Sequence, residues 1–66
     1  MIKTFKVPFN TGLSVVEYTI KVTDRQEERD GWKRAEAINR ASEKFAKDYG
    51  VRYPGRYLLL GKVIEV

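Results

Sequence analysis

Residues 52–57, RYPGRY, are the part of this 66-residue sequence best suited to binding chemistry. They place two guanidinium groups and two phenol rings around a Pro-Gly dipeptide, which is typical of a tight turn. Guanidinium groups bind phosphates or carboxylates through paired hydrogen bonds, and aromatic rings stack on nucleic-acid bases or pack against proteins. Arginine and tyrosine beside a turn also occur as solvated charge next to a half-buried ring. The sequence therefore indicates a candidate binding turn and leaves this purely structural interpretation open.

Catalytic chemistry is poorly supported, because the sequence contains neither histidine nor cysteine. The commonest general base, the commonest metal ligand and the thiolate nucleophile are therefore missing. The hydroxyls of Ser14 and Ser42 have no histidine to activate them. Glu27 and Glu28 lie among arginines, so we expect them to be solvated rather than to form an acid–base pair. We expect a protein that is not an enzyme, with no cofactor, no metal and no small-molecule substrate.

Composition indicates one globular domain spanning residues 1–66, with 42% hydrophobic and 33% charged residues. No apolar run approaches the roughly 20 residues of a membrane-spanning helix, and no signal-peptide pattern is present. We therefore expect a cytoplasmic protein. The net charge of +4 is uneven: residues 24–30 are net acidic, whereas residues 33–62 are net basic. The basic part would suit an acidic partner such as nucleic acid, although such a charge also serves solubility.

One amphipathic helix is expected from Gly31 to Tyr49, because apolar residues recur there with helical spacing. Gly50 is suited to a left-handed cap, Val51 to a contact with Ala46, and Pro54 prevents continuation. Two helix starts are open, one with Asp30 as N-cap and one with a capping box from Thr23 to Gln26. The expected apolar side holds Trp32, Ala35, Ile38, Ala41, Ser42, Phe45, Ala46 and Tyr49.

A β-hairpin is expected before the helix, with strands over residues 2–9 and 14–23 and a turn over residues 10–13. Apolar residues alternate along both strands, which is the pattern of strands buried on one face. A two-residue turn at Thr11 and Gly12 would place Val7 opposite Val16 and Phe5 opposite Tyr18. Pro8 donates no ladder hydrogen bond, so it should lie near a strand end or a bulge.

A third strand is expected over residues 57–66, after a type II turn with Pro54 and Gly55 at its centre. Its aliphatic residues occupy both faces, and Gly61 marks a candidate bulge. Strand, strand, helix and strand in this order predict an α+β fold, a three-stranded antiparallel sheet in the order 2-1-3 with the helix on one face. Besides one face of the third strand, the expected core is Phe5, Val7, Val16, Tyr18, Ile20, Ile38, Phe45 and Tyr49.

One helix cannot cover both faces of such a sheet, so the other face should expose Ile2, Leu13, Val15 and half of the last strand's aliphatic residues. Either neighbouring groups shield this surface, or it binds another protein or a second copy of the chain. Trp32 is either a lid on the core or an exposed binding residue. The candidate partner-binding residues are Arg52, Tyr53, Arg56, Tyr57, Leu58, Leu60, Lys62 and Trp32.

A hairpin, an alanine-rich amphipathic helix and a closing strand in so short a chain without cysteine resemble small phage-encoded proteins that bind and disable host machinery. A phage inhibitor of bacterial RNA polymerase is one such protein. The resemblance lies in size and element order and covers the whole chain, but it provides no residue signature. It implies a protein-binding module that acts on a host protein in the host cytoplasm. A basic nucleic-acid-binding domain and a small structural or accessory subunit are the alternatives.

Overall fold

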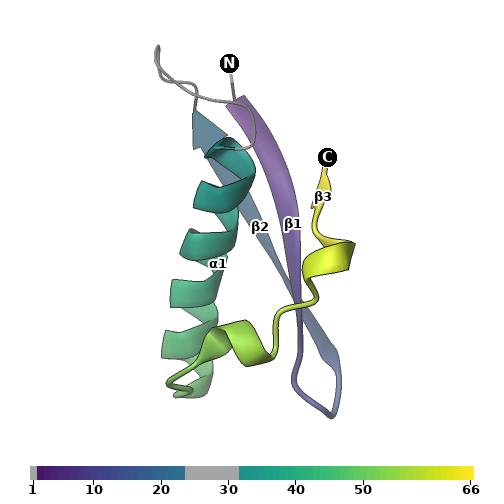
Figure 1. Cartoon of the computed structure of the whole chain (residues 1–66), viewed down its shortest axis with the longest axis vertical. Coiled ribbons are helices and arrows are strands. Elements are labelled where there is room, and N and C mark those ends of the chain that lie inside the picture. The colour runs from purple at the N-terminus through teal and green to yellow at the C-terminus, as the bar shows by residue number, and fades with distance from the viewer. Residues whose placement is uncertain (1, 24–31) are drawn as a thin grey trace.

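The computed structural model of the chain describes residues 2–23 and 32–66. Its elements are β1 (Ile2–Asn10), β2 (Val15–Thr23), α1 (Trp32–Tyr49), two 3-10 helices (Pro54–Arg56 and Leu60–Lys62) and β3 (Ile64–Glu65) (Figure 1). The strands form one antiparallel sheet in the order β2-β1-β3, with α1 packed against it. The predicted α+β fold and sheet order are therefore confirmed. The predictions for the charged segment 24–30, and for the residues Gln26, Asp30 and Gly31 at the helix start, fall outside the described residues.

The β1–β2 hairpin is present, but its predicted register is wrong. Phe5 lies opposite Ile20 and Val7 lies opposite Tyr18, two residues away from the expected pairing. Because side chains alternate with a period of two, this shift keeps both apolar faces together. The pattern of apolar residues alone therefore could not distinguish the two registers.

The hairpin loop explains the shift, since it spans residues 11–14 rather than two residues. Asn10 Oδ1 accepts a hydrogen bond from the N–H of Gly12, and Thr11 Oγ1 accepts from the N–H groups of Leu13 and Ser14. Gly12 has a φ of 93°, which favours glycine. Side chains of Asn10 and Thr11 thus stabilise the longer loop, as these residue types commonly do in turns.

Helix α1 ends as predicted. Gly50 has a φ of 65°, and the N–H of Val51 donates a 3.1 Å hydrogen bond to the carbonyl of Ala46. This bond is the outer one of a Schellman cap. The buried stripe differs from the prediction, however, because it consists of Ala37, Ala41 and Phe45.

The predicted helix face is wrong at its two margins. Ala35 is exposed, and Tyr49 is 49% exposed although its ring stacks on Phe45 at 4.7 Å. Ala41, which lies on the predicted side, and Ala37, which does not, are both buried in the core. Residues with this four-residue spacing form a row along one side of a helix, which rotates the buried side away from Ala35.

The core lies between the sheet and α1 and is centred on an aromatic cluster. The rings of Phe9 and Phe45 stack with their centroids 4.5 Å apart, and Tyr18 meets Phe9 edge-on. Two residues of the expected core are wrong, because half-buried Val16 and exposed Tyr49 do not belong to the core cluster, whereas Tyr18 and Ile38 are half-buried against it. The fully buried apolar residues are Phe5, Val7, Phe9, Ile20, Val22, Ala37, Ala41 and Phe45.

The predicted strand over residues 57–66 is wrong, because only Ile64–Glu65 forms a strand. Phe9 makes an isolated bridge with Leu58, while Lys6 pairs with Ile64. Six residue steps from Leu58 to Ile64 therefore face only three steps of β1, from Lys6 to Phe9. The three additional residues form the 3-10 helix Leu60–Lys62, with Gly61 at its centre.

Pro8 provides a physical reason for this interruption. The even-numbered residues of β1 direct their backbone N–H and C=O groups to residues 51–66, which we call the C-terminal segment. The 3.0 Å hydrogen bond from the N–H of Leu59 to the carbonyl of Pro8 is one example. Pro8 has no N–H, so it cannot donate the second hydrogen bond of this pair to that segment. The chain leaves the sheet directly after Leu59, where a continuous strand would lack this donor.

The predicted type II turn at Pro54 and Gly55 is also wrong. The chain forms a 3-10 helix there, with the N–H of Arg56 donating to the carbonyl of Tyr53 and that of Tyr57 donating to the carbonyl of Pro54. A type II turn needs a positive φ at its third position, and Gly55 does not have one.

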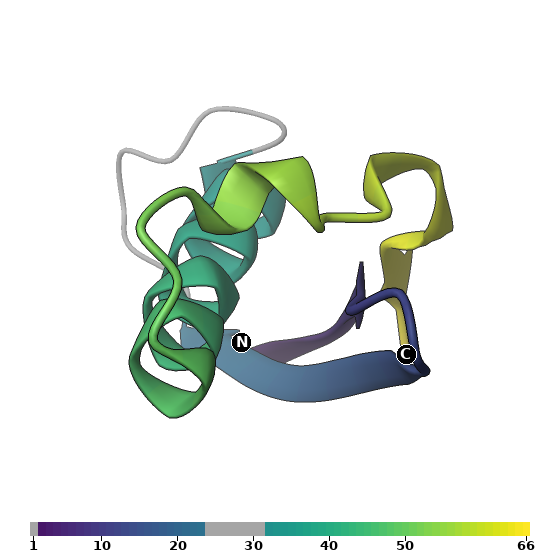
Figure 2. The same ribbon diagram turned by 90° about the horizontal axis from the view of Figure 1, so that it is seen from below.

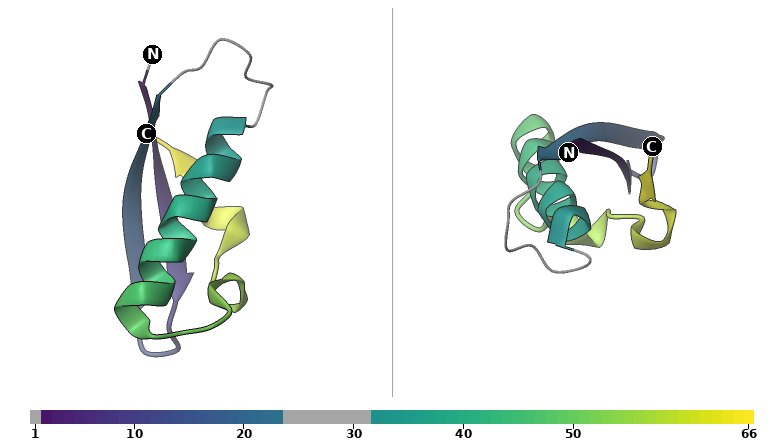
Figure 3. Two further views of the ribbon diagram at one scale, coloured as in Figure 1. Left: turned by 90° about the vertical axis from the view of Figure 1, so that its left-hand side faces the viewer. Right: turned by 90° about the horizontal axis from the view of Figure 1, so that it is seen from above.

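Helix α1 and the 3-10 helix Pro54–Arg56 lie on the same side of the hairpin, as Figures 2 and 3 show. The C-terminal segment adds half-buried Val51, Tyr57, Leu58 and Val63 to the core. The chain therefore closes one side of the sheet with its helix and its C-terminal segment together, and on the opposite side Pro8 alone among the described strand residues is buried.

Candidate partner-binding surface

The side of the sheet that faces away from α1 is the first candidate surface. Because Phe5, Val7 and Phe9 point into the core, the even-numbered side chains of β1 point the other way. Lys6 is paired with Ile64, so Ile64 of β3 and Val66, which follows β3, lie on the same side. We call this surface the open sheet face; it consists of Ile2, Thr4, Lys6, Val15, Glu17, Thr19, Lys21, Thr23, Ile64 and Val66.

Apolar residues gather at one corner of the open sheet face. Ile2 is 60% exposed, Ile64 54% and Val66 69%. The N–H of Val66 donates a 2.8 Å hydrogen bond to the carbonyl of Thr4, which makes Val66 a diagonal neighbour of Ile2. We call these three residues the apolar corner. The exposure of Ile2, Ile64 and Val66 confirms the prediction that one face of the sheet is incompletely covered.

The other exposed aliphatic residues lie elsewhere. Leu13 at the hairpin tip is almost fully exposed, Val15 is exposed at the far end of β2, and Leu60 is exposed in the second 3-10 helix. The exposure of Leu13 and Val15 was predicted, whereas the sequence leaves open which aliphatic residues of the last segment are exposed. These three residues do not extend the apolar corner, because Lys6 and Glu17 occupy the middle of the open sheet face with a 3.8 Å ion pair.

The RYPGRY motif divides into an exposed part and a structural part. Arg52, Tyr53 and Arg56 are exposed, and the guanidinium carbon of Arg56 lies 5.4 Å from the centroid of the Tyr53 ring. Tyr57 is half-buried, and its ring centroid lies 5.6 Å from that of Phe45. Arg52, Tyr53 and Arg56 are therefore accessible to a partner, whereas Tyr57 packs against the core.

The remaining candidate residues are similarly divided. Trp32 and Leu58 are half-buried against the core, which fits the interpretation of Trp32 as a lid. Leu60 and Lys62 are exposed. Arg34 Nη2 donates a 3.1 Å hydrogen bond to the carbonyl of Leu60 and so links α1 to the C-terminal segment.

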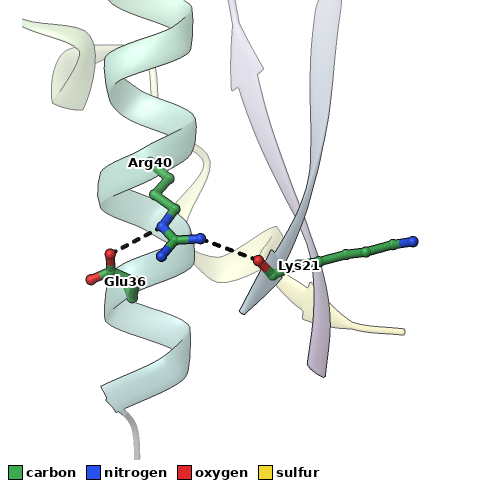
Figure 4. Close-up of polar contacts among 3 residues, drawn as sticks. All are labelled: Lys21, Glu36 and Arg40. Carbon is green, nitrogen blue, oxygen red and sulfur yellow. Dashed lines mark hydrogen bonds and ion pairs between the residues drawn. The ribbon is translucent and has the colours of Figure 1, made fainter. Parts of the chain in front are cut away.

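Sequence reasoning missed two polar contacts between β2 and α1. Tyr18 donates a 2.8 Å hydrogen bond to Asp48 Oδ2, and desolvation of the phenol, assisted by this bond, raises the pKa of Tyr18 to about 12. Arg40 Nη1 donates a 3.3 Å hydrogen bond to the carbonyl of Lys21, while its Nε lies 3.0 Å from Glu36 Oε1 (Figure 4). Only the spacing of Glu36 and Arg40 along the helix was visible in the sequence.

A groove of about 300 Å³ lies beside the Arg40 contact, between β2 and α1. Three of its lining residues are basic, and the backbone of β2 forms one wall. The lining residues are Thr19, Ile20, Lys21, Arg40, Glu43 and Lys44.

Within residues 2–23 and 32–66, no three metal-binding side chains come together. None of the described helices has the length and hydrophobicity needed to cross a membrane. No known protein family, curated protein or solved structure matches the chain significantly.

Proposed function

We propose that this protein is a small non-enzymatic module that binds another protein through the apolar corner of its open sheet face. The supporting observation is the exposure of Ile2, Ile64 and Val66 on the side of the sheet that neither α1 nor the C-terminal segment covers. Adjacent exposed aliphatic residues rimmed by polar groups are typical of interaction sites. The resemblance to phage-encoded inhibitors makes a host protein the class of partner that we propose.

Charge on the open sheet face favours a protein partner over nucleic acid. Lys6 and Lys21 share this face with Glu17, and Glu17 is paired with Lys6. A nucleic-acid surface would place unpaired basic groups along the phosphate backbone. Protein interfaces instead combine an apolar centre with a polar rim of both charges.

Affinity capture from a lysate, with and without nuclease, tests this proposal. We expect a protein that is retained after nuclease treatment, and we expect Ile64→Ser or Val66→Ser to weaken its binding about tenfold or more. Leu13→Ser is the matched control, because it removes an equally accessible aliphatic side chain outside the apolar corner. Capture that is the same for all three variants would contradict the proposal. A partner retained at a fixed stoichiometry in one large assembly would support the accessory-subunit alternative.

The nucleic-acid alternative is supported by a different observation, the exposed Arg52 and the stacked pair of Arg56 and Tyr53. It predicts DNA or RNA affinity that falls steeply with salt and is lost when Arg52 and Arg56 are both changed to alanine. A mobility-shift titration at low salt that shows no binding would eliminate it.

A further inference from the structure

The outer edge of β2 is a nine-residue strand edge without a neighbouring strand in the described part of the chain. Two observations show which backbone groups face outward. Arg40 binds the carbonyl of Lys21 from the side opposite β1. On β1, the groups of Thr4, Pro8 and Asn10 point to the C-terminal segment, so its odd-numbered residues bond to β2. The outward groups of β2 therefore belong to Val15, Glu17, Thr19, Lys21 and Thr23.

This edge is long and mostly open. Within the described residues, the contact from Arg40 to Lys21 is the one protein hydrogen bond to these outward groups. The groove between β2 and α1 is lined by Thr19 and Lys21 on the strand side and by Arg40, Glu43 and Lys44 on the helix side, so a strand that pairs here has to displace these exposed helix side chains from the middle of the edge. Long unprotected edges of β-branched residues are templates for pairing with another strand.

We propose that a second copy of this chain pairs with this edge, β2 against β2 in antiparallel orientation, around a two-fold axis at Thr19. In this register Thr19 lies opposite Thr19 of the second copy. Glu17 lies opposite Lys21 of the second copy, and the two-fold axis repeats this pair. All five outward-facing residues of β2 then have a partner, and the three central pairs alone form about six backbone hydrogen bonds.

Charge selects this register among those that bring outward groups together. Pairing around Glu17 would place two glutamates opposite each other, and pairing around Lys21 would place two lysines opposite each other. Pairing around Tyr18 or Ile20 would leave Glu17 and Lys21 opposite uncharged residues, so only the register around Thr19 forms opposite-charge pairs. Like charges directly opposite one another destabilise a sheet, whereas opposite charges stabilise it. Glu17 already lies 3.8 Å from Lys6, and in the described residues Lys21 has no carboxylate partner of its own. In the dimer, Glu17 of the second copy supplies this carboxylate.

The result is a six-stranded sheet in which both copies keep their open sheet faces on the same side, because the two-fold axis is perpendicular to the sheet. Arg40 must release the carbonyl of Lys21, and its 3.3 Å bond is a long one. The inference uses the strand edge rather than the apolar corner, so it can fail or succeed independently of the proposed function.

Charge exchange tests the register directly. The mass of the wild-type protein is measured by sedimentation equilibrium over a range of concentrations, and we expect a monomer–dimer equilibrium. Glu17→Lys or Lys21→Glu creates two like-charge pairs and should weaken dimerisation about tenfold. The double variant E17K/K21E restores both opposite-charge pairs and should dimerise like the wild type. Lys3→Glu and Glu65→Lys are matched controls, because they change a similar ion pair (3.7 Å) at the other edge of the sheet.

Backbone variants test the edge itself. Thr19→Pro removes an outward N–H but no bond to β1. Circular dichroism should therefore show that this variant is folded, and sedimentation equilibrium should show that it is monomeric. Arg40→Ala frees the carbonyl of Lys21 and should strengthen dimerisation. A wild-type protein that is monomeric up to about millimolar concentration would overturn the proposal. So would a dimer that persists unchanged in the E17K and K21E variants, or one that only Ile64→Ser dissociates.

Discussion

The hydroxyl of Tyr18 donates a 2.8 Å hydrogen bond to Asp48, and this contact joins the middle of β2 to the last turn of α1. Desolvation and this hydrogen bond favour the protonated phenol, so the pKa of Tyr18 is raised from 10.0 to about 12. The folded chain therefore holds this proton at pH values at which the unfolded chain has lost it.

This difference predicts a loss of stability in alkali. The contribution of Tyr18 is fully present below about pH 10 and is lost as the pH rises toward about 12, because the unfolded state binds fewer protons in that range. Denaturant unfolding at a series of pH values measures the free energy of unfolding. Tyr18→Phe should flatten its decline above about pH 10 and remove one late phase from the ultraviolet titration of tyrosine. A loss of absorbance change near pH 10 rather than near pH 12 in this variant would contradict the raised pKa of Tyr18.

The stacked rings of Phe9 and Phe45 predict the most damaging core substitution. Phe45 is 1% exposed and contacts rings from β1, β2 and the C-terminal segment. Phe45→Ala should cost about 3–5 kcal/mol, which approaches the whole stability expected of a domain of this size. Thermal unfolding should therefore lose its cooperative transition or move to a much lower Tm. Tyr53→Ala, which removes an exposed aromatic ring, should change the free energy of unfolding by less than about 0.5 kcal/mol.

Gly50 and Gly55, which both follow α1, should differ in their sensitivity to substitution. Gly50 has a φ of 65°, so Gly50→Ala should destabilise the chain by about 1 kcal/mol. Gly55 lies in a 3-10 helix without a positive φ and has no atom close to the position of an added Cβ, so Gly55→Ala should be close to neutral. Parallel denaturant curves give both values. A larger loss at Gly55 would instead support a type II turn at Pro54 and Gly55.

Elements whose residues repeat with a clear period could be predicted from the sequence. Alternation along residues 2–9 and 14–23 and helical spacing over residues 31–49 each indicate one structure, and together they predict the sheet order. The cap at Gly50 was equally visible, because only glycine adopts its conformation readily.

The errors have non-local or side-chain causes. The hairpin register depends on hydrogen bonds that the side chains of Asn10 and Thr11 accept from backbone N–H groups of the loop, and an apolar pattern does not reveal them. The last segment is apolar on both faces and looks like a strand, yet its interruption lies opposite Pro8, which belongs to another strand.

The candidate surfaces were predicted in the same partial way. The exposure of Ile2, Ile64 and Val66 follows because a single helix can cover only one of the two faces of the sheet. The predicted order 2-1-3 already makes β2 an edge strand, but which of its backbone groups face outward could be recognised only from the contact of Arg40 with Lys21 and from the bonds that β1 makes to the last segment.

The 3-10 helix Leu60–Lys62, which interrupts the pairing of the last segment with β1, has a practical consequence. Fixed pairs with β1 precede and follow it, at Leu58 and at Ile64, so its length is independent of the alignment of the sheet. No atom lies close to the position that a side chain would take at Gly61. This bend is therefore the natural place to graft a fluorophore-bearing residue or an epitope tag for following the chain in solution.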